Sequence, residues 1–206
     1  MRLPQLLIAS HNVGKAHEIA DLLSEYQLDL QFAFQIGISD VVETGKDFIE
    51  NAILKARSAA EESGIPALAD DCGLEVKSLD GKPGIYSRRY AMNLGSWKEA
   101  MTTLNREVLG LDSTAYMCCA LAMVWPNGES CSITAKLEGT LVSPRGERGF
   151  GFDPCFQPLN SPITLGEMEP SYRAKNNHRA LAFTRLTQMI NWETCMVNNN
   201  GYSHCE

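Results

Sequence analysis

The stretch LLIASHNVGKAHEIADLL, residues 6–23, decides how the first part of the chain folds. It opens with an apolar run at 6–9, typical of a buried strand, and turns through small and polar residues at 10–14. The apolar positions that follow have helical spacing: Ala16, Ile19, Ala20 and Leu23. A strand, a short turn and an amphipathic helix in direct succession predict an α/β fold, with Lys15 at the start of the helix.

Patterns in the rest of the chain predict helices and strands around a mixed sheet, in an α/β or α+β fold. The predicted elements are strands at 5–9 and 28–34, helices at 14–25 and 47–63, a strand at 67–69 that 74–76 could continue, a helix from 96 toward 109, a hairpin of strands at 115–125 and 130–137, a glycine-rich loop at 143–153 and a helix at 179–192. Thr44 is predicted to cap the second helix and Gly64 to end it. Ser96–Glu99 has the spacing of a capping box.

The composition excludes several classes of protein. A formal net charge of −7 and a pI near 5.2 argue against a nucleic-acid polymer as partner, although a nucleotide needs only a local cluster of cations. No apolar run approaches the ~20 residues of a membrane span, and the N-terminus does not resemble a signal peptide. Seven cysteines without C-x-x-C spacing predict reduced thiols in a cytoplasmic protein.

The turn at residues 10–15 is the first candidate site. Free N–H groups and the positive end of the dipole at a helix N-terminus suit a phosphate. Gly14 lets the backbone approach an anion closely, and Lys15 adds a full charge. An ordinary turn with a surface lysine explains the same residues equally well. The Walker A pattern does not match, because Ala16 follows the lysine.

Carboxylates and amides follow in two further segments. Asp47, Asn51 and Lys55 recur every four residues on one helix face, for which solvent exposure is the simpler interpretation. Asp70 and Asp71 end the predicted strand at 67–69, where α/β sheets place their sites, and could serve Mg²⁺. Because adjacent side chains of a strand alternate, only one of them is expected to reach a given metal. A turn with two solvated aspartates is the alternative.

Glycines, aromatic residues and arginines gather in the second half of the chain. The segment RGERGFGFDPCF, residues 145–156, could fold over a ligand and stack a ring on a planar base, or form a bulged strand with core phenylalanines. Further donors precede the last predicted helix: Arg173, Lys175, His178 and Arg179. They indicate either a binding cluster or a solvated helix start.

Taken in order, these segments resemble the nonstandard-purine nucleoside triphosphate pyrophosphatase family, that of inosine triphosphatase and dITP/XTP pyrophosphatase. The matching blocks are SHNVGK at 10–15, ETG…FIENA…KA at 43–56, ADDCGL at 69–74, PGIYSRRY at 83–90, GFGFDP at 149–154 and YRAKNNHR at 172–179. The resemblance covers nearly everything from Leu6 to about Ile190. Blocks in the correct order are far more specific than any one of them alone.

The resemblance implies an elongated α/β fold with a long mixed central sheet flanked by helices, two lobes around a cleft, and a homodimer. It implies Mg²⁺-dependent hydrolysis of ITP, dITP or XTP to the monophosphate and pyrophosphate, which cleanses the nucleotide pool. The triphosphate would be held by Ser10, Asn12, Lys15 and Lys55. Glu43 and Asp71 would serve the metal, with Asp71 as the catalytic base. The remaining substrate-binding residues would be Cys72, Phe150, Gly151, Phe152, Asp153, Arg173, His178 and Arg179.

Several residues depart from the family pattern. Ser10 stands for a threonine, Arg88 for an alanine and Phe152 for a tyrosine. His11 replaces a glycine, Cys72 a serine and Arg173 a lysine, for which Lys175 could partly substitute. Because arginine and lysine are not interchangeable at a shaped contact, these changes bear on substrate preference more than on the reaction. The alternatives are a septum-formation-inhibitor type of nucleotide pyrophosphatase, or a nucleotide-sensing module without turnover. The domain is predicted to be a single bilobed one at 1–192, followed by a mobile tail at 193–206 that is dispensable for activity.

Overall fold

The computed structural model describes residues 3–197, and the chain divides into two compact units. Unit 1 consists of Met1–Asp71, Ala120–Thr134 and Ala182–Glu206, and unit 2 of Cys72–Cys119 and Ala135–Leu181. The division falls between Asp71 and Cys72, so these neighbouring candidate residues belong to different units.

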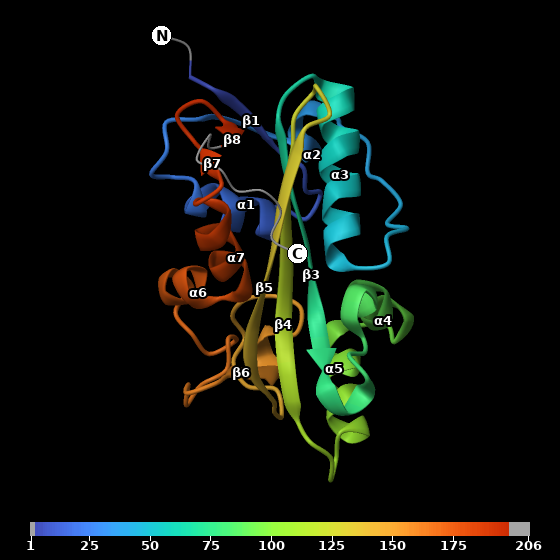
Figure 1. Cartoon of the computed structure of the whole chain (residues 1–206). Coiled ribbons are helices and arrows are strands. Elements are labelled where there is room, and N and C mark those ends of the chain that lie inside the picture. Colours follow the sequence, from blue (N-terminus) through green and yellow to red (C-terminus); the bar gives the residue numbers. More distant parts are fainter. Residues whose placement is uncertain (1–2, 198–206) are drawn as a thin grey trace. The chain divides into compact units, whose positions relative to one another are not determined.

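A six-stranded sheet in the order β2-β1-β3-β4-β5-β6 organises the fold (Figure 1). Its strands are β1 (Gln5–Ile8), β2 (Asp29–Phe32), β3 (Ala67–Val76), β4 (Thr114–Val124), β5 (Ser130–Leu141) and β6 (Phe156–Pro158), and a separate pair consists of β7 (Ile190–Asn191) and β8 (Met196–Val197). Strand β1 pairs in parallel with β2 and β3, whereas β5 and β6 are antiparallel. The predicted mixed sheet of an α/β fold is confirmed.

The helices are α1 (Val13–Leu22), α2 (Ala33–Ile36), α3 (Phe48–Ser63), α4 (Ser87–Asn93), α5 (Trp97–Glu107), α6 (Pro170–Asn176) and α7 (His178–Leu186). Short 3₁₀ turns are η1 (Lys77–Leu79), η2 (Gly84–Tyr86) and η3 (Asp153–Cys155). Helices α4 and α5 lie side by side in unit 2 (Figure 1). Among the described residues, none of these helices has both the length and the apolar character needed to cross a membrane.

The caps of α3 and α5 follow the sequence with one correction. Helix α3 is capped by Asp47, whose carboxylate accepts a hydrogen bond from Glu50 N at 2.8 Å, and not by Thr44. Asp47 directly precedes the first helical residue, which places its side chain within reach of the free N–H groups. Ser96 caps α5 at the predicted position, since its Oγ accepts a hydrogen bond from Glu99 N at 3.1 Å. Gly64 ends α3 in the left-handed conformation, as predicted.

Strand β3 corrects a second prediction, because it runs through Asp70 and Asp71 instead of ending there. Both side chains are buried, with 2% and 5% of each residue exposed. Charged residues interrupt a strand when nothing inside the protein compensates them, but here each aspartate lies beside a lysine. The alternation expected from the strand is present, because the two aspartates contact different lysines.

Each unit has its own apolar core. In unit 1, residues 6–8 of β1 are fully buried, and α3 contributes the face predicted for it: Phe48, Ala52, Ala56 and Ala59. In unit 2, the core contains Leu74, Leu104, Phe152 and Phe156, with Tyr90 and Leu79 packed against it.

The C-terminal region differs from the prediction. Helix α7 ends at Leu186, and Pro170–Asn176 forms a helix that the sequence patterns did not indicate. The described part of the predicted tail, 193–197, forms a turn and strand β8, with Cys195 buried and its carbonyl accepting a hydrogen bond from Trp125 Nε1. The rest of the tail, 198–206, lies outside the described residues.

Candidate functional site

The turn between β1 and α1 has the geometry of an anion-binding helix start. Asn12 caps α1, its Oδ1 accepting from Lys15 N at 3.1 Å, which leaves the side-chain NH₂ as the group that could donate to a phosphate. Ser10 is buried, and its hydroxyl donates to the Asn12 carbonyl at 3.4 Å. The predicted residues Ser10, Asn12 and Lys15 are therefore brought together at one helix end.

Five charged side chains of unit 1 form what we call the carboxylate–lysine cluster: Lys15, Glu43, Lys55, Asp70 and Asp71. Lys55 Nζ lies 2.9 Å from Glu43 Oε1 and 3.2 Å from Asp71 Oδ1. Lys15 Nζ lies 3.3 Å from Asp70 Oδ2. Segments far apart in sequence thus converge on two ammonium groups, and three carboxylates against two lysines give the cluster a formal charge of −1.

Burial sets the protonation of the cluster. Burial raises the pKa of the Asp71 carboxyl and outweighs the opposing pull of Lys55 and Lys15. For Lys55, burial and Lys15 favour a lower pKa, but Asp71, Asp70 and Glu43 together overcome them, and the pKa is raised. Lys55 therefore stays charged, while Asp71 is a carboxyl that takes up a proton more readily than an exposed aspartate.

Asn51 is a member of the site that the sequence analysis treated as part of a solvated helix face. It is fully buried, and its Nδ2 donates to Asp71 Oδ2 at 3.2 Å, so Lys55 and Asn51 hold the two oxygens of Asp71. Its Oδ1 accepts from Gly45 N at 2.8 Å. A Cβ at Gly45 would lie 2.6 Å from that oxygen, so only glycine fits there. The four-residue spacing of Asp47, Asn51 and Lys55 was the sequence feature that could have indicated this role for Asn51.

His11, which departs from the family pattern, contacts the segment leading to Glu43. Its Nε2 lies 2.8 Å from the Ile38 carbonyl oxygen, and its Nδ1 lies 3.5 Å from Asp40 Oδ1. The ring thereby connects the turn that carries Asn12 with the loop that carries Glu43.

In unit 2, Phe150, Asp153, Arg173 and Arg179 form what we call the arginine–aromatic cluster. Asp153, 1% exposed, accepts at Oδ2 from Phe150 N at 3.0 Å and from Arg173 Nη1 at 2.9 Å. Gly149 has a φ of 78°, and a Cβ there would lie 2.1 Å from the same carboxylate oxygen. The glycine is required because the loop closes tightly over the Asp153 carboxylate.

The two predicted phenylalanines have different environments. Phe150 is half-buried, and the guanidinium carbons of Arg173 and Arg179 each lie 5.7 Å from its ring centroid. Phe152 is 3% exposed, belongs to the core and packs edge-to-face on Trp97 at 5.0 Å. Phe150 is therefore the ring available for stacking, and Phe152 is a packing residue, the alternative that the sequence had left open. Gly151 passes over the Trp97 ring.

The remaining predicted residues surround Arg179. Arg179 is fully buried, and its Nη2 donates to Cys72 Sγ at 3.4 Å. His178 is 2% exposed, at the start of a helix where Asn177 Oδ1 accepts from Ala180 N at 2.8 Å. Lys175, by contrast, is exposed on α6. The described cysteines are free thiols, as predicted.

The carboxylate–lysine cluster fits a Mg²⁺ site in which the protein supplies only some of the ligands and the substrate phosphates would supply others. No group of three or more His, Cys, Asp or Glu side chains that could hold a metal occurs among the described residues. One Glu43 oxygen and one Asp71 oxygen nevertheless converge on a single cation, the Lys55 ammonium. Mg²⁺ commonly takes one or two carboxylates and completes its shell with water and phosphate oxygens. Glu43 and Asp71 are therefore the residues that would hold the ion.

The sequences of known proteins carry the same pattern across the chain. A dITP/XTP pyrophosphatase from Caulobacter vibrioides is 46% identical over 186 residues, covering 88% of this chain and 95% of the relative. The enzyme of the same name from Rhodospirillum centenum is 44% identical and covers 88% and 92%. A solved HAM1 protein from Coxiella burnetii has a TM-score of 0.83 at 32% identity, covering 90% of this chain and 98% of that one.

The fold and the two clusters define an α/β protein with the features of a nucleotide-binding enzyme. The model of the Ham1 family matches residues 6–189, and the Ham1 protein of Staphylococcus aureus also shares the fold, with a TM-score of 0.79 at 32% identity over 89% of this chain and 96% of that one. This chain belongs to the Ham1 family.

Proposed function

We propose that this chain hydrolyses nonstandard purine nucleoside triphosphates, namely ITP, dITP and XTP, to the nucleoside monophosphate and pyrophosphate. The names of its relatives and the matched family model support this activity. The observation that carries it is the Lys55 ammonium within 3.2 Å of both Glu43 and Asp71, beside a capped helix start with a second lysine. This combination suits a polyphosphate and its metal ion.

In the proposed reaction, water attacks the α-phosphorus, and the bond from that phosphorus to the bridging oxygen breaks. Asp71 accepts a proton from the water, its carboxylate oriented by Lys55 and Asn51. Pyrophosphate leaves with the electron pair of the broken bond. Lys15 and Lys55 stabilise the negative charge that gathers on the phosphate oxygens.

Mg²⁺ is part of this proposal, with Glu43 and Asp71 as its protein ligands. The formal charge of −1 on the carboxylate–lysine cluster supports it, because two lysines do not neutralise three carboxylates and a triphosphate together. When bound, the ion supplies charge neutralisation and polarises the phosphate. Chelation of Mg²⁺ by EDTA should therefore abolish turnover, and added Mg²⁺ should restore it.

We assign the purine to the arginine–aromatic cluster. The Phe150 ring offers a stacking surface, and the Arg173 and Arg179 guanidiniums offer donors only. Hypoxanthine and xanthine present a 6-oxo acceptor, whereas adenine presents a 6-amino donor that these groups would oppose. A site that depends on such a hydrogen bond can reject the mismatched analogue by up to ~10⁴-fold.

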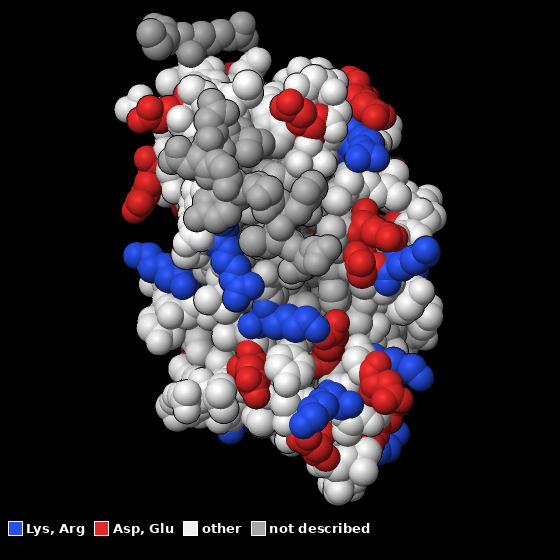
Figure 2. Space-filling model, viewed as in Figure 1, with Lys and Arg blue, Asp and Glu red and all other residues white. Residues whose placement is uncertain are grey.

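Two finer proposals accompany the activity. We propose a homodimer, which sedimentation equilibrium of the full chain would test, and a cytoplasmic location, which fractionation of the source cells would test. We propose nucleotides as substrates and no nucleic-acid polymer as partner. On the face drawn in Figure 2, the lysines and arginines of the described residues are interleaved with aspartates and glutamates, and a nucleic-acid polymer needs continuous basic surface.

The deciding experiment measures product and selectivity together. We expect pyrophosphate from ITP and XTP, with kcat/KM for both well ahead of GTP, and GTP at or above ATP. Release of orthophosphate alone would contradict the assignment, and binding without turnover would favour a sensing module.

A further inference from the structure

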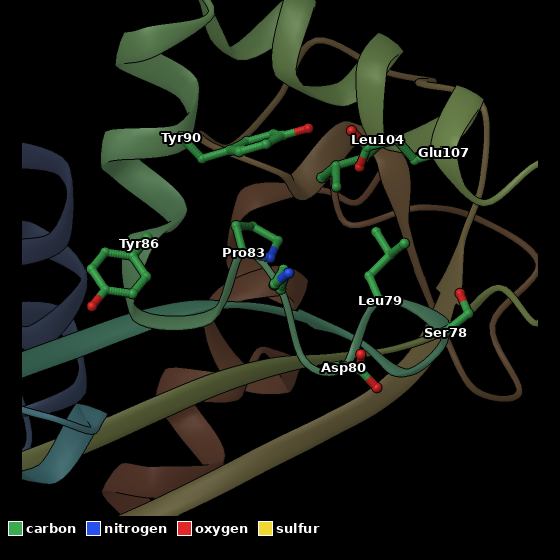
Figure 3. A pocket seen from close by; sticks show the side chains of 9 residues that line it. Ser78, Leu79, Asp80, Pro83, Tyr86, Tyr90, Leu104 and Glu107 are labelled. Carbon is green, nitrogen blue, oxygen red and sulfur yellow. The ribbon is translucent and has the colours of Figure 1, made fainter.

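Unit 2 contains a cavity that has no role in the proposed reaction. Its volume is about 590 Å³, within the range of small-molecule sites. It is lined by Ser78, Leu79, Asp80, Lys82, Pro83, Tyr86, Tyr90, Leu104 and Glu107 (Figure 3). These residues come from η1, the turn after it, η2, α4 and α5, and none belongs to either cluster described above.

Two buried hydroxyl groups in this cavity have no hydrogen-bond partner within the described part of the chain. They are Ser78 Oγ and Tyr90 Oη, each with almost no exposed surface. Leaving a buried polar group without a partner costs about 1–3 kcal/mol, so native structures rarely keep two in one place unless something else bonds them. The pair indicates a ligand with polar atoms.

The charges and the apolar lining define the chemistry of that ligand. Leu79, Pro83 and Leu104 provide apolar surface for a hydrocarbon body. Figure 3 shows the Tyr90 hydroxyl and the Glu107 side chain directed toward the same part of the cavity. Burial and the Glu107 charge raise the pKa of the Tyr90 phenol, so the hydroxyl stays neutral and its oxygen can accept a hydrogen bond. With Asp80 and Glu107 against Lys82 alone, the lining has a formal charge of −1.

We propose that this cavity binds an amphipathic organic monocation, a protonated amine on an apolar or aromatic body. The ammonium group lies between the Glu107 carboxylate and the Tyr90 hydroxyl, to which it donates. The body packs on Leu79, Pro83 and Leu104 and against the Tyr90 ring. Such an arrangement gives the buried Tyr90 hydroxyl a hydrogen-bond donor and the Glu107 carboxylate a charge of opposite sign, which an anion or a neutral hydrocarbon would not.

Calorimetric titration of the full chain with three probes of similar shape tests this proposal. The probes are 2-phenylethylammonium, the neutral 2-phenylethanol and the anionic 3-phenylpropionate. We expect the ammonium probe to bind about tenfold more tightly than the alcohol, and the carboxylate not to bind. Equal binding of ammonium and alcohol would overturn the proposal, as would carboxylate binding that is lost in Lys82→Ala.

Substitutions of the lining residues test whether the ammonium probe binds in this cavity. Glu107→Gln should remove the preference for the cation, and Tyr90→Phe should weaken ammonium binding while leaving the ring in place. Glu99→Gln is the matched control, since Glu99 is an exposed carboxylate of the same helix outside the cavity lining. Unchanged ammonium binding in Glu107→Gln would overturn the proposal.

The ammonium group in the cavity could also come from a lysine side chain of a second copy of this chain. Sedimentation of the protein with and without the ammonium probe distinguishes the two sources. If the probe dissociates a dimer, the occupant is a lysine of the second copy, and the small-molecule assignment is wrong.

Discussion

The carboxylate–lysine cluster and the arginine–aromatic cluster solve opposite electrostatic problems. In unit 1, three carboxylates oppose two lysines, and the excess negative charge suits the Mg²⁺ ion that we propose for this cluster. In unit 2, two arginines oppose one aspartate, and their planar cations lie on a phenylalanine ring. The first suits a triphosphate, which all nucleoside triphosphates have in common, and the second a planar ring that differs among them. Rate and selectivity are therefore expected to separate by cluster.

The largest effect should follow Asp71→Asn, which removes the proposed catalytic base. We expect kcat to fall by ~10²-fold or more for every nucleotide, with the ratio of ITP to ATP unchanged. Steady-state kinetics on the folded variant checks this, with Asp21→Asn, an exposed aspartate of α1, as control. A folded Asp71→Asn protein with the kcat of the wild type would remove Asp71 from the mechanism.

Arg173→Gln should do the reverse and change selectivity more than rate. Loss of the guanidinium removes a charged donor and leaves Asp153 with fewer partners, so the ratio of kcat/KM for ITP over ATP should fall about tenfold. Lys175→Gln, on the exposed side of the same helix, should leave the ratio unchanged. If the lysine variant loses selectivity instead, Lys175 takes the role that the family gives to position 173.

Asn51→Leu tests whether the unit 1 cluster depends on a buried amide. The change leaves Asp71 Oδ2 and Gly45 N without their partner, and we expect the free energy of unfolding to drop by about 1–3 kcal/mol. Denaturant titration measures it. The comparison between clusters predicts that kcat falls while selectivity is retained. A stable variant with full activity would show that Lys55 alone positions Asp71.

The smallest effect should come from removing residues 193–206, whose described part, 193–197, contributes to neither cluster. Trp125 Nε1 loses the Cys195 carbonyl as acceptor, and one buried hydrogen bond is worth about 1 kcal/mol. Thermal unfolding of the truncated chain should show this loss, and Trp125→Phe should cost much less in the truncated chain than in the full one. Kinetics should stay near those of the full chain; a change in kcat or selectivity would show that the tail acts on a cluster.

The elements that patterns predict well here are those held by local interactions. Strand β1, helix α1, the capped helix α5 and the hairpin of β4 and β5 follow from periodicity and turn chemistry. Strand β3 was broken in the prediction, because two aspartates and a glycine read as a turn. It is continuous because Lys15 and Lys55, distant in sequence, compensate those aspartates. Phe150 and Phe152 have similar local sequence, and only packing against Trp97 assigns one of them to the core.

The sequence by itself determined the mixed α/β fold, the family and the residue types available for chemistry, because apolar periodicity and ordered motif blocks are local properties of the chain. The tertiary structure decided which of those residues meet. It joined Glu43, Lys55 and Asp71, converted Asn51 from a presumed surface residue into a buried support, and gave Arg179 its place over Phe150. Those outcomes depend on burial and on charges far apart along the chain, whose energies exist only after the chain has folded.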